Sequence, residues 1–184
     1  MGKIGIFGGS FDPVHDGHIH LATLAKEKLG LDEVRFLPCQ ISPHKTETPP
    51  TPGDVRAKWL EIALSGIPWA KVDPIELETE GPSYSYQTMR KLHELHPGNQ
   101  WFWIMGGDQW KVFTSWRNSE VISELAEFIV LARNGEEVQP IEGYRLHVVE
   151  GEHPASATKI RRSLAMGEEN ISFLDPRIAT TIQK

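Results

Sequence analysis

Short apolar runs alternate along this chain with segments whose apolar residues recur at helical spacing. The apolar runs, each typical of a buried strand, fall at residues 3–7, 33–38, 70–73, 101–105, 128–132 and 144–149. Helical spacing is found at residues 17–29, 54–64, 84–95, 108–113, 118–125 and 156–167, and in a final segment from residue 175. This alternation predicts an α/β fold, a doubly wound Rossmann-like parallel sheet with helices on both faces.

Capping residues define some of these boundaries. Asp54 and Ser156 are predicted to cap the helices that they begin, and Asp175 precedes Pro176, which suits the first position of a helix. Residues 40–52 are rich in proline, threonine and charge, which predicts an exposed, mobile loop. Ligands of such sheets bind beyond the carboxyl ends of the strands, so the loops that follow strands are the places to search for a site.

Composition limits the class of protein. A length of 184 residues suits one domain, residues 1–184, with a C-terminal helical part from about residue 155. An apolar share of 39%, before glycine is counted, is typical of a globular protein rather than a disordered one. The single cysteine, Cys39, excludes an internal disulfide and a cysteine-based zinc site.

Charge and hydropathy limit the kinds of partner that the protein is expected to bind. The net charge of −6 does not favour broad binding to nucleic acid or to an anionic membrane, although a small anionic ligand remains compatible with it. No apolar run approaches the roughly 18 residues that span a bilayer, and the apolar stretch at the N-terminus is too short for a secretory signal. We therefore expect a cytoplasmic protein that binds neither nucleic acid nor membrane. A homo-oligomer is compatible with the sequence, which does not itself indicate an oligomeric state.

The loop after the first strand, residues 8–18, combines glycines, a helix start and two histidines. A strand followed by glycines and a helix N-terminus presents backbone N–H groups to phosphate. His15 and His18, three residues apart, can place two imidazole donors beside one anion. Two alternatives are metal binding, for which no third ligand stands nearby, and simple capping of turns.

Two further loops carry candidate chemistry. Ser156, Thr158 and Arg161 lie at a helix start, where they suit an anion site, although a plain serine cap with solvated basic residues is the alternative. After the central strand, Gly106 allows close backbone approach, and the carboxylate of Asp108 can accept from a ribose hydroxyl. Eight residues beyond Asp108, Trp116 offers a flat face to a heteroaromatic ring, although a lone tryptophan is more often core packing.

The loop at residues 8–18 and the helix start at residues 156–161 resemble two motifs of the nucleotidyltransferase superfamily. The run G-S-F-D-P-x-H-x-G-H is similar to the T/H-x-G-H motif, and Ser156–Arg161 is similar to I-S-S-T-x-I-R, with departures at the alanines 155 and 157. The resemblance implies a fold of the nucleotidyltransferase type. It also implies an ATP site made by Gly9, Ser10, Phe11, His15, His18, Gly106, Asp108, Ser156, Thr158 and Arg161.

Within the superfamily, nearly the whole chain resembles the bacterial nicotinate mononucleotide adenylyltransferases. The matching features are Pro-His-Lys at 43–45, P-S-Y-S-Y-Q-T at 82–88, Gly-x-Asp with the later tryptophan, and a strand that ends in arginine. The resemblance implies that the pyridine ring stacks on Trp116 and that donors around Ser85 meet its carboxylate. It further implies that Lys45 and Arg133 lie near the phosphates of the mononucleotide and ATP.

The reaction that this resemblance implies joins nicotinate mononucleotide to the AMP moiety of ATP, which gives deamido-NAD and pyrophosphate in NAD biosynthesis. His15, His18 and Arg161 would be catalytic, and Mg²⁺ would be carried by the ATP phosphates without a metal site of the protein. Three alternatives stay open: nicotinamide mononucleotide as acceptor, phosphopantetheine as acceptor, or a non-catalytic nucleotide sensor. A dehydrogenase is disfavoured, because the G-x-G-x-x-G spacing is missing.

Overall fold

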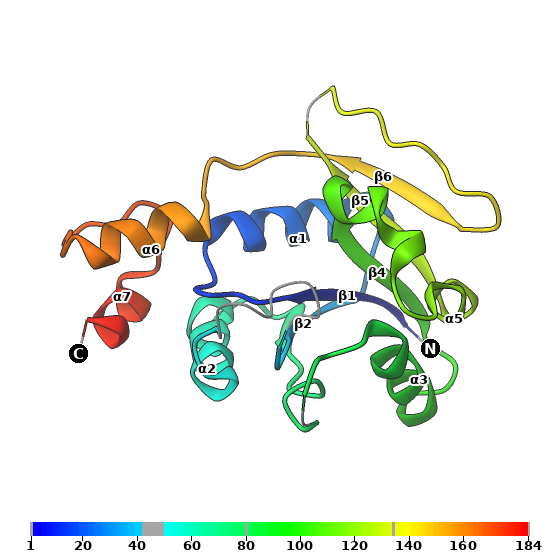
Figure 1. Ribbon diagram of the computed structural model, residues 1–184, viewed down its shortest axis with the longest axis horizontal. Helices are drawn as coiled ribbons and strands as arrows, with labels where there is room; N and C mark the ends of the chain where they lie inside the picture. Colours follow the sequence, from blue (N-terminus) through cyan, green and yellow to red (C-terminus); the bar gives the residue numbers. More distant parts are fainter. Residues whose placement is uncertain (1, 42–49, 80, 134, 184) are drawn as a thin grey trace.

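A parallel sheet forms the centre of the protein (Figure 1). The computed structural model describes residues 2–41, 50–79, 81–133 and 135–183. The strands in these residues are β1 (Lys3–Gly9), β2 (Glu33–Pro38), β3 (Ala70–Val72), β4 (Gln100–Gly106), β5 (Ala126–Ala132) and β6 (Leu146–Glu150). They form a six-stranded sheet in the order β3-β2-β1-β4-β5-β6, and each neighbouring pair is parallel. The predicted doubly wound sheet is therefore confirmed.

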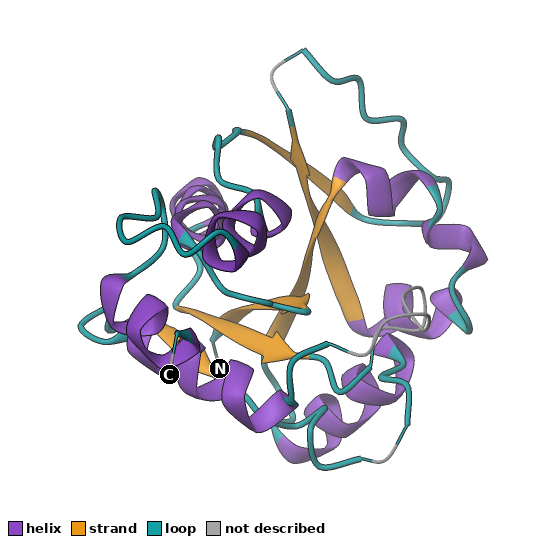
Figure 2. Cartoon of the chain, turned by 60° about the vertical axis from the view of Figure 1, so that its left-hand side comes forward, coloured by secondary structure: helices purple, strands orange, loops and turns teal. Residues whose placement is uncertain are grey.

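Helices lie on both sides of this sheet, as the turned view shows (Figure 2). They are α1 (Asp16–Leu29), α2 (Gly53–Leu64), α3 (Ser85–Leu95), α4 (Gly107–Lys111), the 3₁₀ helix η1 (Phe113–Ser115), α5 (Ser119–Leu125), α6 (Ala157–Ala165) and α7 (Pro176–Ile182). In the described residues, no helix is long and apolar enough to cross a membrane.

Strand β4 shows why a continuous apolar run forms a central strand. Trp101, Trp103 and Met105 pack into one core cluster, with residues of α3 and α5. Phe102 and Ile104 point to the opposite face and join a second cluster, with residues of α1 and α2. Because successive strand residues face opposite sides, a strand covered on both faces needs apolar side chains throughout.

The strand order places a crevice at the carboxyl edge of the sheet. Strand β1 pairs with β2 on one side and with β4 on the other, so the chain reverses its direction of winding at β1. The loops that follow β1 and β4 therefore diverge to opposite faces, and such a switch point is where ligands of open α/β sheets bind. Both strands end in glycine, at Gly9 and Gly106.

The predicted helix caps have mixed outcomes. Asp175 is an N-cap, and its side chain accepts a hydrogen bond from the Arg177 backbone N–H. Asp54 is not the N-cap of α2, because the helix begins at Gly53 and Pro52 takes the cap position. Ser156 occupies the N-cap of α6, but its side chain makes no capping hydrogen bond. Its backbone carbonyl accepts the first helical bond, from the Ile160 N–H at 2.9 Å.

The C-terminal helices pack on the same face of the sheet as α1 and α2. Figure 1 shows α6 and α7 side by side, next to the start of α1. Ile160 of α6 and Ile178 of α7 belong to the core cluster of that face. The Asp16 N–H donates to the Phe173 carbonyl at 3.0 Å, which joins the segment between α6 and α7 to the start of α1. These contacts bring α6 to the loop that carries the histidine pair.

Candidate active site

A cavity of about 560 Å³ opens at the switch point. Its walls come from the ends of β1 and β4, the residue after β2, the approach to α3 and the turn after η1. The lining residues include Gly9, Ser10, Cys39, Glu76, Ser83, Ser85, Trp103, Gly106, Gln109, Trp116 and Arg117. Five residues predicted to bind ATP or the mononucleotide, from four separate segments of the chain, thus line one cavity: Gly9, Ser10, Ser85, Gly106 and Trp116.

Two of the glycines in the wall, Gly9 and Gly106, have close neighbours on the side where a Cβ atom would lie. A Cβ atom on Gly9 would lie 3.1–3.3 Å from ring atoms of Phe11, and one on Gly106 would lie 2.7 Å from the Asp108 Oδ1 atom. The Phe11 ring is itself 2% exposed and belongs to the core, although its backbone has a φ of +48°. A side chain at Gly9 would therefore press on the buried Phe11 ring, whereas one at Gly106 would require the exposed Asp108 side chain to move.

The histidine pair lies at the start of α1, in the same loop as Ser10. The rings of His15 and His18 stack with centroids 3.8 Å apart and an interplanar angle of 24°. The Nδ1 atom of His18 accepts from the His15 backbone N–H at 3.2 Å, so the proton of a neutral His18 ring is on Nε2. Gly17 permits this stack, because a Cβ there would lie 3.1 Å from the His15 ring and 3.2 Å from the Nδ1 atom of His153.

Both imidazoles are neutral in the free protein at pH 7. Burial lowers the pKa of His15 to about 4, and the nearby His153 adds to the shift. Burial also lowers the pKa of His18 to about 3, with a further contribution from His15. The Nδ1 atom of His15 is buried and has no hydrogen-bond partner among the described residues. A buried polar atom of this kind is costly to leave unpaired, which suits a site that a ligand completes.

Helix α6 is attached to the histidine loop by an arginine. The Arg161 Nη1 atom donates to the Asp12 carbonyl at 2.6 Å, and Nη2 donates to the Thr158 Oγ1 atom at 3.3 Å. Thr158 and Arg161 are exposed, and Ser156 is half-buried at the helix start. The structure therefore brings the two predicted phosphate-binding motifs together, because residues that are 149 positions apart share a hydrogen bond.

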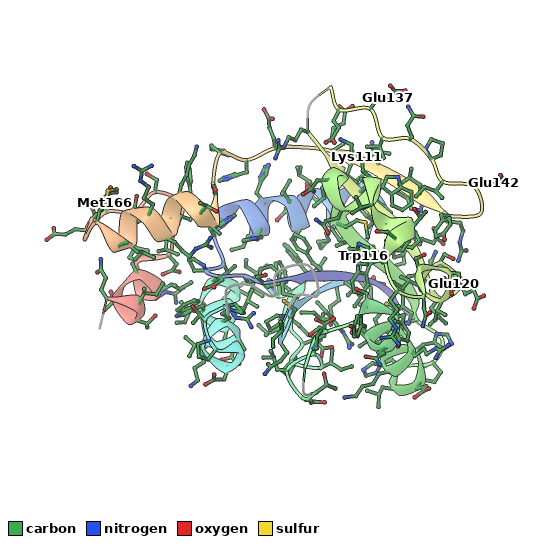
Figure 3. All side chains as sticks on the ribbon, viewed as in Figure 1. Lys111, Trp116, Glu120, Glu137, Glu142 and Met166 are labelled. Carbon is green, nitrogen blue, oxygen red and sulfur yellow. The ribbon has the colours of Figure 1, made fainter. Side chains whose placement is uncertain are left out.

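Aromatic rings form the other end of the cavity. Trp116 follows η1 and is labelled in Figure 3, and its ring packs against Phe113 with centroids 5.3 Å apart. The guanidinium of Arg117 lies 5.2 Å from the ring centroid of Tyr84, the residue before Ser85. Trp116 is half-buried. It packs against the core cluster and also lines the cavity.

Of the predicted site residues that the structure describes, eight do not line the cavity: Phe11, His15, His18, Asp108, Arg133, Ser156, Thr158 and Arg161. Asp108 is exposed in α4, and Arg133 is exposed at the end of β5 with its backbone N–H bound to the Glu136 carboxylate at 3.1 Å. Both lie at the carboxyl edge of the sheet, yet neither lines the cavity. Lys45 falls outside the described residues.

The cavity is also lined by a carboxyl group, that of Glu76, to which the sequence assigned no role. Glu76 is 6% exposed and accepts from the Thr88 Oγ1 atom at 2.8 Å. Burial raises the pKa of Glu76, and the charge of Asp73 adds to this effect against the bonds from Thr88 and Ser83. No pattern marks Glu76 in the sequence, because it lies in a loop between a short strand and a helix.

The described residues contain no group of three or more histidine, cysteine, aspartate or glutamate side chains arranged to hold a metal ion. The described site offers hydrogen-bond donors and positive charge. Its donors are backbone N–H groups after glycine-ended strands, imidazole rings and a guanidinium, all of which suit an anionic ligand.

Comparison with known proteins shows the family to which this chain belongs. Residues 6–163 match the cytidylyltransferase-like family, which covers most of the chain. The chain belongs to this family of nucleotidyltransferases.

Individual relatives refine the assignment. A protein of Geobacillus kaustophilus named "Probable nicotinate-nucleotide adenylyltransferase" is 36% identical over 96% of this chain and 81% of its own length. The nicotinate-nucleotide adenylyltransferase of Bacillus subtilis is 39% identical over 76% of this chain and 74% of its own length. The similarity places the chain with the nicotinate-nucleotide adenylyltransferases of the family, and the resemblance seen in the sequence is confirmed.

A solved structure shows the same fold. The nicotinic acid mononucleotide adenylyltransferase of Plasmodium falciparum, in complex with NaAD, aligns with a TM-score of 0.73. The alignment covers 99% of this chain and 95% of that chain at 19% sequence identity. At this identity the likeness concerns the fold, which agrees with the strand order described above.

Proposed function

We propose that this protein transfers the adenylyl group of ATP to the 5′-phosphate of nicotinate mononucleotide, which yields deamido-NAD and pyrophosphate. The observation that carries the proposal is the single cavity at the switch point, in which glycine-ended strands meet Ser85 and Trp116. The stacked histidine pair begins the helix after the first of those strands. Membership among the nicotinate-nucleotide adenylyltransferases supports the same reaction.

The pyridine mononucleotide binds at the aromatic end of the cavity. Its ring stacks on Trp116, and its carboxylate accepts from donors around Ser85 at the start of α3. ATP lies along the loop after β1, where Gly9 and Ser10 leave room for its phosphates. Asp108 and Arg133 act from the rim in this proposal, on the ribose of ATP and on a phosphate respectively, because both are exposed outside the cavity wall.

The chemistry requires positioning rather than a general base. The attacking phosphate has a second pKa near 6, so most of it is doubly ionised at neutral pH. In-line attack forms a bond from its oxygen to the α-phosphorus, and the bond to the bridging oxygen of pyrophosphate breaks. The work of the protein is to align the two phosphates and to stabilise the charge that moves to the leaving group.

His15, His18 and Arg161 supply the stabilising donors. A neutral imidazole has a single N–H, and in His18 this group is Nε2–H, since Nδ1 is used by the His15 backbone. The guanidinium of Arg161 makes two protein contacts, which leaves further N–H groups for phosphate oxygens. Because the rings are neutral before ATP arrives, phosphate binding favours their protonated forms and raises both pKa values.

ATP enters as its magnesium complex in this proposal. Mg²⁺ prefers oxygen ligands and retains several waters, so phosphate oxygens and water are sufficient to hold it. We therefore treat the ion as part of the substrate rather than as a resident cofactor.

A panel of acceptors tests the proposal. We would measure initial rates of pyrophosphate release from Mg–ATP with nicotinate mononucleotide, nicotinamide mononucleotide or phosphopantetheine, each at the same subsaturating concentration. A reaction without acceptor corrects for hydrolysis of ATP. We expect nicotinate mononucleotide to have the highest kcat/KM. A higher value for another acceptor would contradict the assigned substrate, and no release with any of them would indicate a nucleotide-binding protein without turnover.

A further inference from the structure

A fully buried arginine, to which the proposed reaction assigns no role, lies behind the cavity wall. Arg56 of α2 is 0% exposed and shares the buried face of the helix with Trp59, Leu60 and Leu64. An apolar side chain is expected at such a position, because burying a charge is costly unless hydrogen bonds compensate for it. The partners of the guanidinium therefore explain its presence.

These partners are four backbone carbonyls in three segments of the chain. The Nε atom of Arg56 donates to the Thr51 carbonyl and Nη1 donates to the Ser10 carbonyl, both at 2.6 Å. Nη2 donates to the Cys39 carbonyl at 2.6 Å and to the Gln40 carbonyl at 3.3 Å. One rigid group thus holds the loop after β1, the residues after β2 and the residue pair before α2.

The same contacts extend to both parts of the site. Ser10 and Cys39 line the cavity, so two of the four carbonyls belong to its wall. The peptide of Thr51 is held from both sides, because its N–H donates to the Asp12 Oδ2 atom at 3.1 Å while its carbonyl accepts from Arg56. Asp12 in turn accepts the hydrogen bond of Arg161 through its carbonyl. A continuous set of bonds therefore leads from the buried arginine to the exposed one.

We propose that Arg56 is a positioning residue of the adenylyl transfer, which fixes the Ser10–Asp12 loop and the Cys39–Gln40 and Thr51 segments in the arrangement that in-line attack requires. The inference rests on the proposed function. Arg56 touches no substrate in this account, and it acts through the backbone carbonyls that its guanidinium binds.

The planar fork of arginine makes this role sensitive to a conservative change. Arg56→Lys keeps the charge, but an ammonium has three donors on a flexible stem and no fork that matches acceptors on three segments. A displacement of about 1 Å in reacting groups can lower a rate by about 100-fold. We expect kcat to fall by about this factor in Arg56→Lys, while KM for both substrates changes far less.

Arg35→Lys provides the matched control. Arg35 of β2 is partly buried and forms ion pairs with Glu33 and Asp73, and none of these three residues lines the cavity. The Arg35→Lys substitution should lower the unfolding temperature without lowering kcat. If Arg56→Lys retained the kcat of the Arg35→Lys variant, the role of Arg56 would be purely structural and the inference wrong.

A second variant guards against failure of Arg56→Lys to fold. Asp12→Ala removes the hydrogen bond that the Asp12 carboxylate accepts from the Thr51 N–H. Because the Asp12 side chain is only half-buried, we expect the variant to fold, and we expect its kcat to be lower. In the double variant the loss should be smaller than the product of the single losses, because both changes release the same peptide. An unchanged kcat in Asp12→Ala, or losses that simply multiply, would overturn the inference.

A readout without turnover separates this inference from the proposed function. The amide of Cys39 donates to the Gly9 carbonyl at 3.0 Å, and the amide of Thr51 donates to Asp12. Hydrogen exchange at both amides should be faster in Arg56→Lys, or in Asp12→Ala, than in Arg35→Lys. Unchanged exchange would refute the positioning role whatever the substrates are. Faster exchange in a protein without turnover would instead retain the clamp and contradict the proposed reaction.

Discussion

Replacement of His18 by alanine tests the phosphate-binding role of the histidine pair. The change removes the Nε2–H donor proposed to stabilise the leaving group, and loss of one such donor costs about 3 kcal/mol, or at least about 100-fold in kcat. It also removes the bond from the His15 N–H to Nδ1 and the ring stacked at 3.8 Å on His15. The lost bond alone is worth about 1 kcal/mol of stability. Turnover and unfolding temperature must therefore be measured together.

Two further substitutions at His18 separate these effects. Asparagine places an acceptor where Nδ1 lies but has no group at the position of Nε2, so His18→Asn should keep stability and lose turnover. Glutamine reaches the position of Nε2 with an N–H group, so His18→Gln should retain part of kcat while it loses the bond to His15. Steady-state rates of pyrophosphate release and thermal unfolding supply the two readouts. Near wild-type turnover in His18→Ala, or equal turnover in the asparagine and glutamine variants, would refute the role.

Two other expectations concern the cavity and pH. Trp116→Ala should raise KM for the mononucleotide far more than KM for ATP, since stacking of a base on an aromatic ring is worth about 1–3 kcal/mol; equal increases would indicate packing alone. The lowered pKa values of His15 and His18, about 4 and about 3, mean that below about pH 6.5 the unfolded chain binds protons that the free folded protein does not. The unfolding temperature should therefore fall as pH drops from about 7 to 5, and by less in His18→Asn; an identical decrease in both proteins would show that His18 contributes nothing to it.

Local patterns in the chain were sufficient for the fold, and they indicated part of the candidate site. Residues 101–105 of β4 are all apolar because both faces of the strand are covered by core residues. This apolar run can be recognised from the sequence alone. The spacing of His15, Gly17 and His18 is also a local property, and a Cβ atom at the glycine would lie 3.1 Å from the His15 ring. Caps were less predictable, as Asp54 shows, because a helix can begin one residue earlier without a side-chain cap.

Arg56 and Glu76 illustrate what local patterns miss. In the sequence, Arg56 is one polar residue in a helix, although its position on the face of Trp59 and Leu60 is a usable signal. Its acceptors lie 5 to 46 positions away along the chain. Glu76 is likewise an ordinary acidic residue until the fold buries it beside Thr88. Burial and partners over such separations depend on how the loops pack.

The amino-acid sequence by itself determined the alternation of strands and helices and the family of the protein, and it predicted a phosphate-binding role for the first loop. These depend on side-chain periodicity and on residues that are neighbours in the chain. Only the tertiary structure decided that Gly9, Ser85 and Trp116 share one cavity, that Arg161 reaches the histidine loop, and that Asp108 and Arg133 remain outside the cavity wall. The physical reason is that the parallel sheet brings the carboxyl ends of distant strands to one edge, whereas packing sets the direction of each loop beyond it.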